Sequence, residues 1–171
     1  KVFHMVLTSS NHPPYTIDVD KEGFKRSEVI AKLPDSIKNE DKTINELGHM
    51  WYMDKAIGNF VKTTEVIEPN SLFVITGDHS ERFYFTKEQE AKTKSAIPCL
   101  FYGAGIRKAM FKDVKVGVHN QIAGTIAELI APAGFEYSAM MGNIFFENAV
   151  FNHYLAADKA GIIGLNKNIE L

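Results

Sequence analysis

Two polar stretches of the sequence carry the residue types that bind metal ions and anions. Asp78 and His79 stand side by side directly after an apolar run that ends at Gly77. His12 follows a second apolar run, residues 2–8, and the two prolines after it stiffen its loop. A carboxylate oxygen and an imidazole nitrogen together suit Mn²⁺, Zn²⁺ or Mg²⁺. The sequence therefore predicts a metal site at Asp78 and His79, and a donor for an anionic oxygen or a leaving alkoxide at His12.

A second interpretation stays open for both stretches. An adjacent Asp and His in a loop commonly form a turn or a cap, and a lone histidine commonly packs within its own loop. From the pattern alone, metal binding and local packing are alternatives.

The elements on both sides of these stretches predict how they are positioned. The apolar run before Gly77 is rich in β-branched residues, which is typical of a buried strand in a parallel sheet. Residues 42–66 have apolar side chains at helical spacing and would form the crossover from a strand at 2–8. Ligands of such sheets bind at the carboxyl ends of the strands. We expect an α/β fold, a mostly parallel sheet with helices on both faces, whose edge brings His12, Asp78 and His79 together.

The remaining segments predict further elements of the same domain. We expect a short helix at 27–33, a strand at 97–102 that ends in the turn Gly103–Gly105, a strand at 114–118, a helix at 120–130, and a small terminal antiparallel pair at 149–155 and 161–165.

Other polar residues are weaker candidates. His119 and Asn120 begin a predicted helix near a strand end, so they would approach the same edge. Arg82 would be able to clamp a phosphate oxygen, although an exposed arginine after a turn is commonly solvated. His4 is expected in the core of its apolar strand, whereas His49 and His153 have no companions that indicate a site.

Composition narrows the class of protein. With 171 residues, 19 basic and 21 acidic, the chain fits one domain and has no basic stripe for nucleic acid. Its one cysteine, Cys99, excludes an internal disulfide and is expected to be a buried core residue. No apolar run approaches the ~20 residues that cross a bilayer, so no membrane span is expected in this chain.

Five stretches, in order, carry a family resemblance: SSNHPPY, WYMDKAIGNF, SLFVITGDHS, IPCLFYGAGI and HNQIAGTIAELI. Together they resemble the C-terminal half of the sulfatase and alkaline-phosphatase superfamily, and most closely its lipoteichoic acid synthase-like, phosphoglycerol-transferase branch. The resemblance covers nearly the whole chain. It implies an alkaline-phosphatase-like fold, metal ligands at Asp78 and His79, and a contact from His12 to the phosphate-type group.

The chain departs from the family pattern in two places. Gln121 and Gly124 stand where the family often has an aspartate and a proline, which puts a further metal ligand there in doubt and favours the single-metal transferase type. No segment matches the acidic ligand and the threonine, serine or cysteine-derived nucleophile that the family carries upstream. Residues 1–171 are therefore expected to be the C-terminal part of one catalytic domain, without its N-terminal part and inactive alone.

The resemblance implies a metal-dependent phosphoglycerol- or phosphoethanolamine-type transferase, or a phosphodiester hydrolase, acting on a lipid or glycan with one divalent ion, foremost Mn²⁺. A sulfuric ester hydrolase that uses Ca²⁺ is the alternative enzyme, and a non-catalytic module that binds anionic glycans is the alternative outside catalysis. The family also implies an extracytoplasmic domain of a membrane-anchored protein.

Overall fold

The computed structural model describes residues 2–35, 40–80, 96–114, 116–146, 149–151, 155–158 and 162–164. The chain is a mixed α/β protein that divides into two compact units, Lys1–Phe73 and Val74–Leu171. Each unit is described by itself. No helix in the described ranges is long and apolar enough to cross a membrane.

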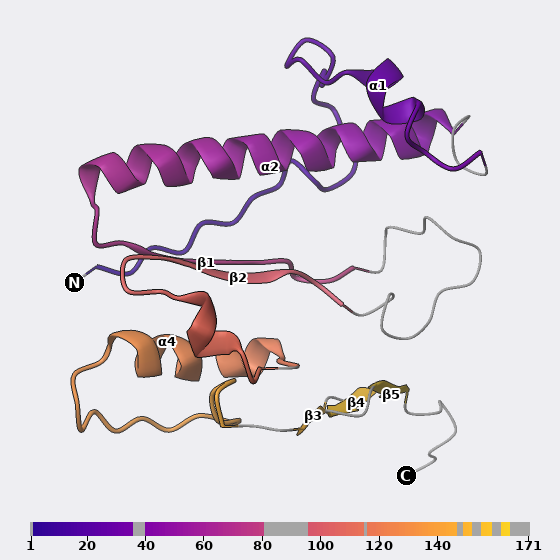
Figure 1. Ribbon diagram of the computed structural model, residues 1–171. Helices are drawn as coiled ribbons and strands as arrows, with labels where there is room; N and C mark the ends of the chain where they lie inside the picture. The colour runs from indigo at the N-terminus through magenta and orange to yellow at the C-terminus, as the bar shows by residue number, and fades with distance from the viewer. Residues whose placement is uncertain are drawn as a thin grey trace. The chain divides into compact units, whose positions relative to one another are not determined.

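The long helix α2, Asp41–Ile67, dominates the first unit and confirms the helix predicted at 42–66 (Figure 1). Its first half is the packed half, because the buried residues Thr43, Ile44, Gly48 and His49 all lie there. Gly48 is required for this packing, since a Cβ at that position would lie 2.7 Å from Cγ2 of Val19.

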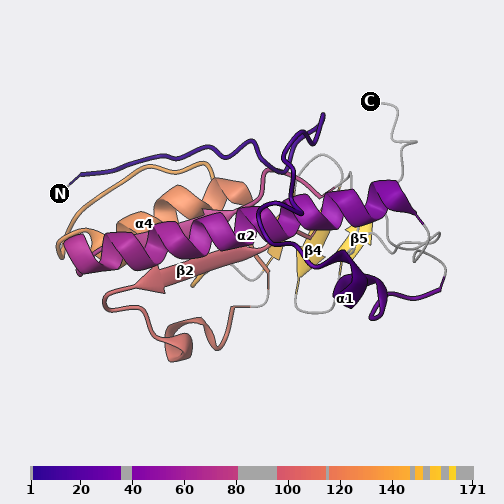
Figure 2. The ribbon, with the colours of Figure 1, turned by 90° about the horizontal axis from the view of Figure 1, so that it is seen from above.

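The core of the first unit forms where a looped segment folds onto α2. Val19, Phe24 and Ile44 are buried together, and the ring of Phe24 packs on that of Trp51 with centroids 5.7 Å apart. The short helix α1, Arg26–Ile30, lies beside the first half of α2 (Figure 2). The helix predicted at 27–33 is thus present but ends early, because a turn replaces it ahead of Pro34.

The strand predicted at residues 2–8 is wrong. These residues are extended but belong to no strand, and their apolar side chains are exposed, from 66% at Val6 to 93% at Leu7. An apolar run becomes a strand only where a neighbour pairs its backbone, and no described residue does so here. The predicted parallel pairing is therefore not found, and His4 is exposed instead of lying in a core.

The strand predicted before Gly77 is confirmed as β1, Leu72–Thr76, which pairs with β2, Cys99–Gly103. The two strands are antiparallel, which corrects the expectation of parallel neighbours (Figure 1). The chain leaves the end of β1 and returns beside it, so β2 runs in the opposite direction to β1. The predicted turn follows, with φ of +127° at Gly103 and +82° at Gly105, angles that favour glycine.

Cys99 was expected in the core, and that prediction is wrong: it is exposed on β2. The sheet that carries it has only two described strands, and an edge strand cannot bury both faces of an apolar run. The strand predicted at 114–118 is also wrong for its described residues, because Val114 and residues 116–118 have irregular structure.

The helix predicted at 120–130 is confirmed as the short 3₁₀ helix η2, His119–Gln121, continued by α4, Ile122–Ile130. Residues on α4 that are buried include Gly124 and Thr125, whereas Ile130 is exposed. Aromatic rings form the packing nearby: Phe111, from the 3₁₀ helix η1 (Lys108–Phe111), lies between Phe101 and Phe145 with centroid distances of 5.4 and 5.3 Å.

The C-terminal antiparallel element is also confirmed. It has three strands where a pair was predicted: β3 (Ala149–Phe151), β4 (Leu155–Asp158) and β5 (Ile162–Gly164), in the order β3-β4-β5. Ala149 pairs with Asp158, and Leu155 with Gly164. The extra strand arises because β4 extends into the segment that was expected to connect the pair.

Candidate metal centre

Asp78 and His79 stand just beyond the last residue of β1 and face one another. Oδ1 of Asp78 accepts a hydrogen bond from the backbone N–H of His79 at 3.0 Å. Oδ2 of the same carboxylate lies 3.6 Å from Nε2 of His79. The carboxylate side chain is 85% exposed and the imidazole 39%. The two side chains therefore share one solvent-accessible environment at the strand end.

This separation fits joint coordination of one ion. Ligand bonds of about 2.0–2.1 Å in tetrahedral or octahedral geometry place neighbouring ligand atoms roughly 3.0–3.4 Å apart. Oδ2 of Asp78 and Nε2 of His79, at 3.6 Å, need only a small adjustment to reach it. Within the described part of the chain no three His, Cys, Asp or Glu side chains gather as a metal site. The pair would thus supply two ligands of a larger shell.

The side chain of His119 bonds to the backbone of the Asp78–His79 corner, which we define as residues 77–80. Nε2 of His119 lies 2.7 Å from the carbonyl oxygen of Gly77, at donating distance in the matching tautomer. The hydroxyl of Thr76 also donates to this oxygen, at 3.2 Å. Both bonds hold the peptide that leads into Asp78. Sequence placed His119 near the strand end, and the structure shows which atom it meets.

The residues after His119 turn away from the corner. Nδ2 of Asn120 points to the sulfur of Met140, 3.9 Å away. Gln121 is fully buried, and its Oε1 accepts the backbone N–H of Val118 at 3.0 Å. This acceptor oxygen caps η2 and is not presented for coordination. Nε2 of Gln121 is also buried and has no hydrogen-bond partner within the described structure.

Thr125 ties the start of α4 to a distant segment, which sequence reasoning missed. Its hydroxyl donates to the carbonyl of Gln121 at 2.7 Å and accepts the backbone N–H of Ile144 at 3.2 Å. Thr125 is fully buried. A threonine one turn after a buried polar residue in an otherwise apolar helix is the signal that indicates such a tie.

His12 lies in the first unit, in a loop that hydrogen bonds within itself. We call residues 9–15 the His12 loop. The N–H of His12 donates to Ser9 at 3.1 Å, and the N–H of Tyr15 donates to the carbonyl of His12 at 3.4 Å. Nδ1 of the exposed imidazole lies 2.7 Å from the carbonyl of Pro13. With Nδ1 as the donor there, Nε2 is the nitrogen left for a ligand.

His49, on α2, is the functional candidate that sequence reasoning passed over. It is fully buried, and both of its ring nitrogens have partners: Nδ1 lies 2.9 Å from the carbonyl of Asn45, and Nε2 accepts the N–H of Ile17 at 3.2 Å. The edge of its ring meets that of Tyr15, with centroids 5.1 Å apart. Its position beside Gly48 on the buried side of α2 was the available signal.

Several predicted relations are not tested by this geometry. His12 and Asp78 belong to different units, so their meeting at one edge stays a prediction. Arg82 and His153 lie outside the described residues.

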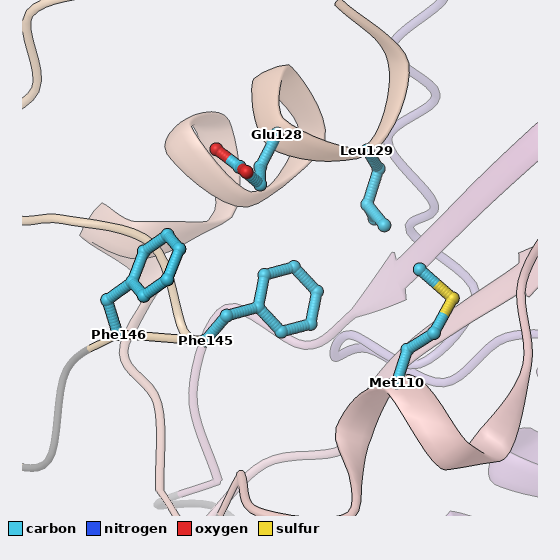
Figure 3. A pocket seen from close by; sticks show the side chains of 5 residues that line it. All are labelled: Met110, Glu128, Leu129, Phe145 and Phe146. Atoms are coloured by element: carbon cyan, nitrogen blue, oxygen red, sulfur yellow. The ribbon is translucent and has the colours of Figure 1, made fainter.

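A hollow in the second unit is separate from these residues. It has a volume of about 330 Å³ and is lined by Met110, Glu128, Leu129, Phe145 and Phe146 (Figure 3). Apolar side chains make up most of this lining, and none of the candidate site residues belongs to it.

Comparison with known proteins gives one match. The sulfatase family matches residues 1–131, which include the His12 loop, the Asp78–His79 corner and His119. Searches of curated proteins and of solved structures found no match. Because the family match covers well over half of the 171 residues, the chain belongs to the sulfatase family.

Proposed function

We propose that this chain is part of a metal-dependent transferase or hydrolase that acts on phosphodiesters, of the type that transfers phosphoglycerol or phosphoethanolamine groups to lipids or glycans. One observation carries the proposal: Oδ2 of Asp78 and Nε2 of His79 converge to 3.6 Å at the end of β1. Membership of the sulfatase family supports an ester substrate and a metal-dependent enzyme.

Ester transfer needs a nucleophile, a means to absorb charge on the equatorial oxygens, and a proton for the leaving group. A divalent ion, when bound, neutralises that charge and lowers the pKa of a coordinated hydroxyl. Asp78 and His79 would hold this ion, Mn²⁺ foremost, with Zn²⁺ or Mg²⁺ as alternatives. The bond from His119 to the carbonyl of Gly77 would keep the peptide before Asp78 in place.

His12 would serve the substrate. The bond from its Nδ1 to the carbonyl of Pro13 orients the ring. When the ring carries both protons, Nε2–H is the remaining donor, and it would bind an anionic ester oxygen or protonate the departing alkoxide. The role requires that the His12 loop and the Asp78–His79 corner meet in an alkaline-phosphatase-like sheet, which belongs to the same proposal.

The metal shell must be completed by other groups, since a divalent ion takes at least four ligands. In our proposal those ligands and the nucleophile come from residues outside this chain, in the preceding part of the same domain. The whole protein would be membrane-anchored, with this domain extracytoplasmic.

Gln121 favours the single-metal transferase over the two-metal phosphatase. Its only strong acceptor, Oε1, is used by the N–H of Val118, and the side chain is fully buried. A second ion at this position would have to break that cap. A sulfuric ester hydrolase with Ca²⁺ is the second candidate, because sulfatase family membership is shared by both classes.

Turnover by the complete gene product tests the proposal. It is assayed on a chromogenic phosphodiester and a chromogenic sulfate ester, each with Mn²⁺, Zn²⁺, Mg²⁺ or Ca²⁺. We expect phosphodiester turnover with Mn²⁺, lost in Asp78→Asn and kept in Asp113→Asn, a control at an 87% exposed carboxylate.

Three results would overturn it. Sulfate turnover with Ca²⁺ would establish the sulfatase alternative, and glycan binding without any turnover would establish the binding module. Turnover by the 171-residue chain alone would show that the nucleophile lies within it.

A further inference from the structure

We propose that His49 is a positioning residue: from inside the core of the first unit it sets where the His12 loop places its imidazole. The inference rests on the proposed role of His12, but it concerns a residue that touches neither substrate nor metal in that proposal. Its basis is the hydrogen bonding and burial of His49 itself.

The first step is that His49 uses its whole hydrogen-bonding capacity inside the protein. A neutral imidazole has one donor and one acceptor nitrogen. Nδ1 donates to the carbonyl of Asn45, one turn earlier on α2, and Nε2 accepts the N–H of Ile17, 32 residues away in sequence. These partners assign the tautomer with the proton on Nδ1. No part of the ring is exposed, so water does not replace either bond.

The second step is that the two long-range contacts of His49 fall on the last residue of the His12 loop, Tyr15, and on Ile17 just after it. The bond to Ile17 fixes the backbone where the loop joins the core, and the ring edge of His49 meets that of Tyr15 at an interplanar angle of 64°. Tyr15 has φ of +50°, a backbone conformation that residues other than glycine adopt at a cost. Surrounding contacts must therefore hold it.

The third step links this end of the loop to His12. The N–H of Tyr15 donates to the carbonyl of His12 at 3.4 Å, and the N–H of His12 donates to Ser9 at 3.1 Å. A chain of contacts thus runs from the core to His12: the ring of His49 packs on that of Tyr15, and the N–H of Tyr15 bonds to the carbonyl of His12. Misplacing a substrate-contacting group by about 1 Å costs up to about 100-fold in rate, so a loop anchor has a measurable effect at a distance.

Two substitutions separate hydrogen bonding from packing. His49→Phe keeps an aromatic ring beside Tyr15 but leaves the N–H of Ile17 without its acceptor. His49→Gln offers an amide with both a donor and an acceptor. His4→Gln is the matched control, because His4 is an exposed histidine of the same unit.

The experiment titrates the full chain with inorganic phosphate and follows the ring signals of His12 by NMR, with amide exchange at Ile17 as a second readout. In His49→Phe we expect phosphate affinity at His12 to fall about tenfold and exchange at Ile17 to quicken at least as much. His49→Gln should recover most of both, and His4→Gln should match the native chain. Unchanged affinity and exchange in His49→Phe would overturn the inference.

Two further results keep the inference separate from the proposed function. If phosphate does not move the His12 signals of the native chain, the role of His12 fails, and exchange at Ile17 alone still decides whether His49 anchors the loop. If His49→Phe does not fold, the native chain decides through the ¹⁵N shifts of the His49 ring. A ring protonated on Nε2 would overturn the inference, since Ile17 would then face a second donor.

Discussion

The two regions that carry the candidate site are anchored by histidines in opposite ways. The His12 loop is held from a core, by the fully buried His49. The Asp78–His79 corner is held at the surface, by the exposed His119 on the carbonyl of Gly77. A hydrogen bond shielded from water is stronger than one with which water competes. Under the proposed function, this difference would give a His12 loop that is set before the substrate binds, and an Asp78–His79 corner that adjusts when an ion binds.

Removing one imidazole from each region should separate metal binding from anion binding, with the largest effect. We expect His79→Ala to weaken Mn²⁺ binding by more than about 100-fold, because loss of a ligand should exceed the 10- to 100-fold effect of a supporting residue. His12→Ala should leave Mn²⁺ affinity within about twofold, because the proposal assigns metal binding to Asp78 and His79 and not to His12. Free Mn²⁺ measured by electron paramagnetic resonance checks both. Equal losses in the two variants would contradict the division of labour.

A glycine substitution tests whether the buried anchor depends on a tightly packed core. In Gly48→Ala the new Cβ would lie 2.7 Å from Cγ2 of Val19 and 3.2 Å from the ring of Phe24. We expect the free energy of unfolding to fall by roughly 1–3 kcal/mol, the usual cost of overpacking. Denaturant unfolding followed by the fluorescence of Trp51, the only tryptophan, measures it.

Gly58→Ala is the matched control on the same helix. Nothing lies within 4 Å of its Cβ position, so alanine should stabilise α2 by roughly 0.5–1 kcal/mol. If Gly48→Ala raised the stability by a similar amount, the first half of α2 would not be the packed half.

The surface anchor should matter less than a ligand. We expect His119→Ala to weaken Mn²⁺ binding about tenfold, because the peptide before Asp78 loses a donor to the carbonyl of Gly77. His119→Gln, which keeps a donor, should lie closer to the native value. Asn120→Ala is the control, since its side chain contacts the sulfur of Met140. Calorimetric titration with Mn²⁺ measures all three, and native affinity in His119→Ala would argue against any support from His119.

The sequence predicted elements whose pattern is long or whose ends are marked. Helix α2 has many turns of apolar spacing, and β1 is bounded by Asn70 and Gly77. Residues 2–8 and 114–118 were misjudged because an apolar run indicates burial without indicating the partner that would bury it. Strand formation depends on that distant partner more than on local preference.

The residues of the candidate site were likewise predicted in part and missed in part. Asp78 and His79 are adjacent in sequence, so their convergence followed from a strand that ends before them. His49 and Thr125 were missed because their partners, the backbone N–H groups of Ile17 and Ile144, are 32 and 19 residues away. A local pattern can indicate that such a side chain is buried, but it does not specify a partner so far away in sequence, which is fixed only when the core forms.

The smallest expected effect concerns Cys99, which lies on β2, the strand paired with β1. Although the residue is exposed, partial burial of its thiol raises its pKa above the ordinary value, and a hydrogen bond with Thr76 offsets part of that rise. A raised pKa favours the neutral thiol in the fold, so this contribution to stability is complete below the unfolded pKa and is lost as pH rises above it.

We therefore expect iodoacetamide to alkylate Cys99 more slowly in the native chain than in the denatured chain near pH 8, with the difference shrinking at higher pH. Thr76→Val should slow alkylation further, because it removes the hydroxyl whose single proton can turn from the carbonyl of Gly77 to the thiolate when that forms. Rates followed by mass spectrometry decide the matter, and a native rate equal to the denatured one would show that β2 leaves its thiol fully hydrated.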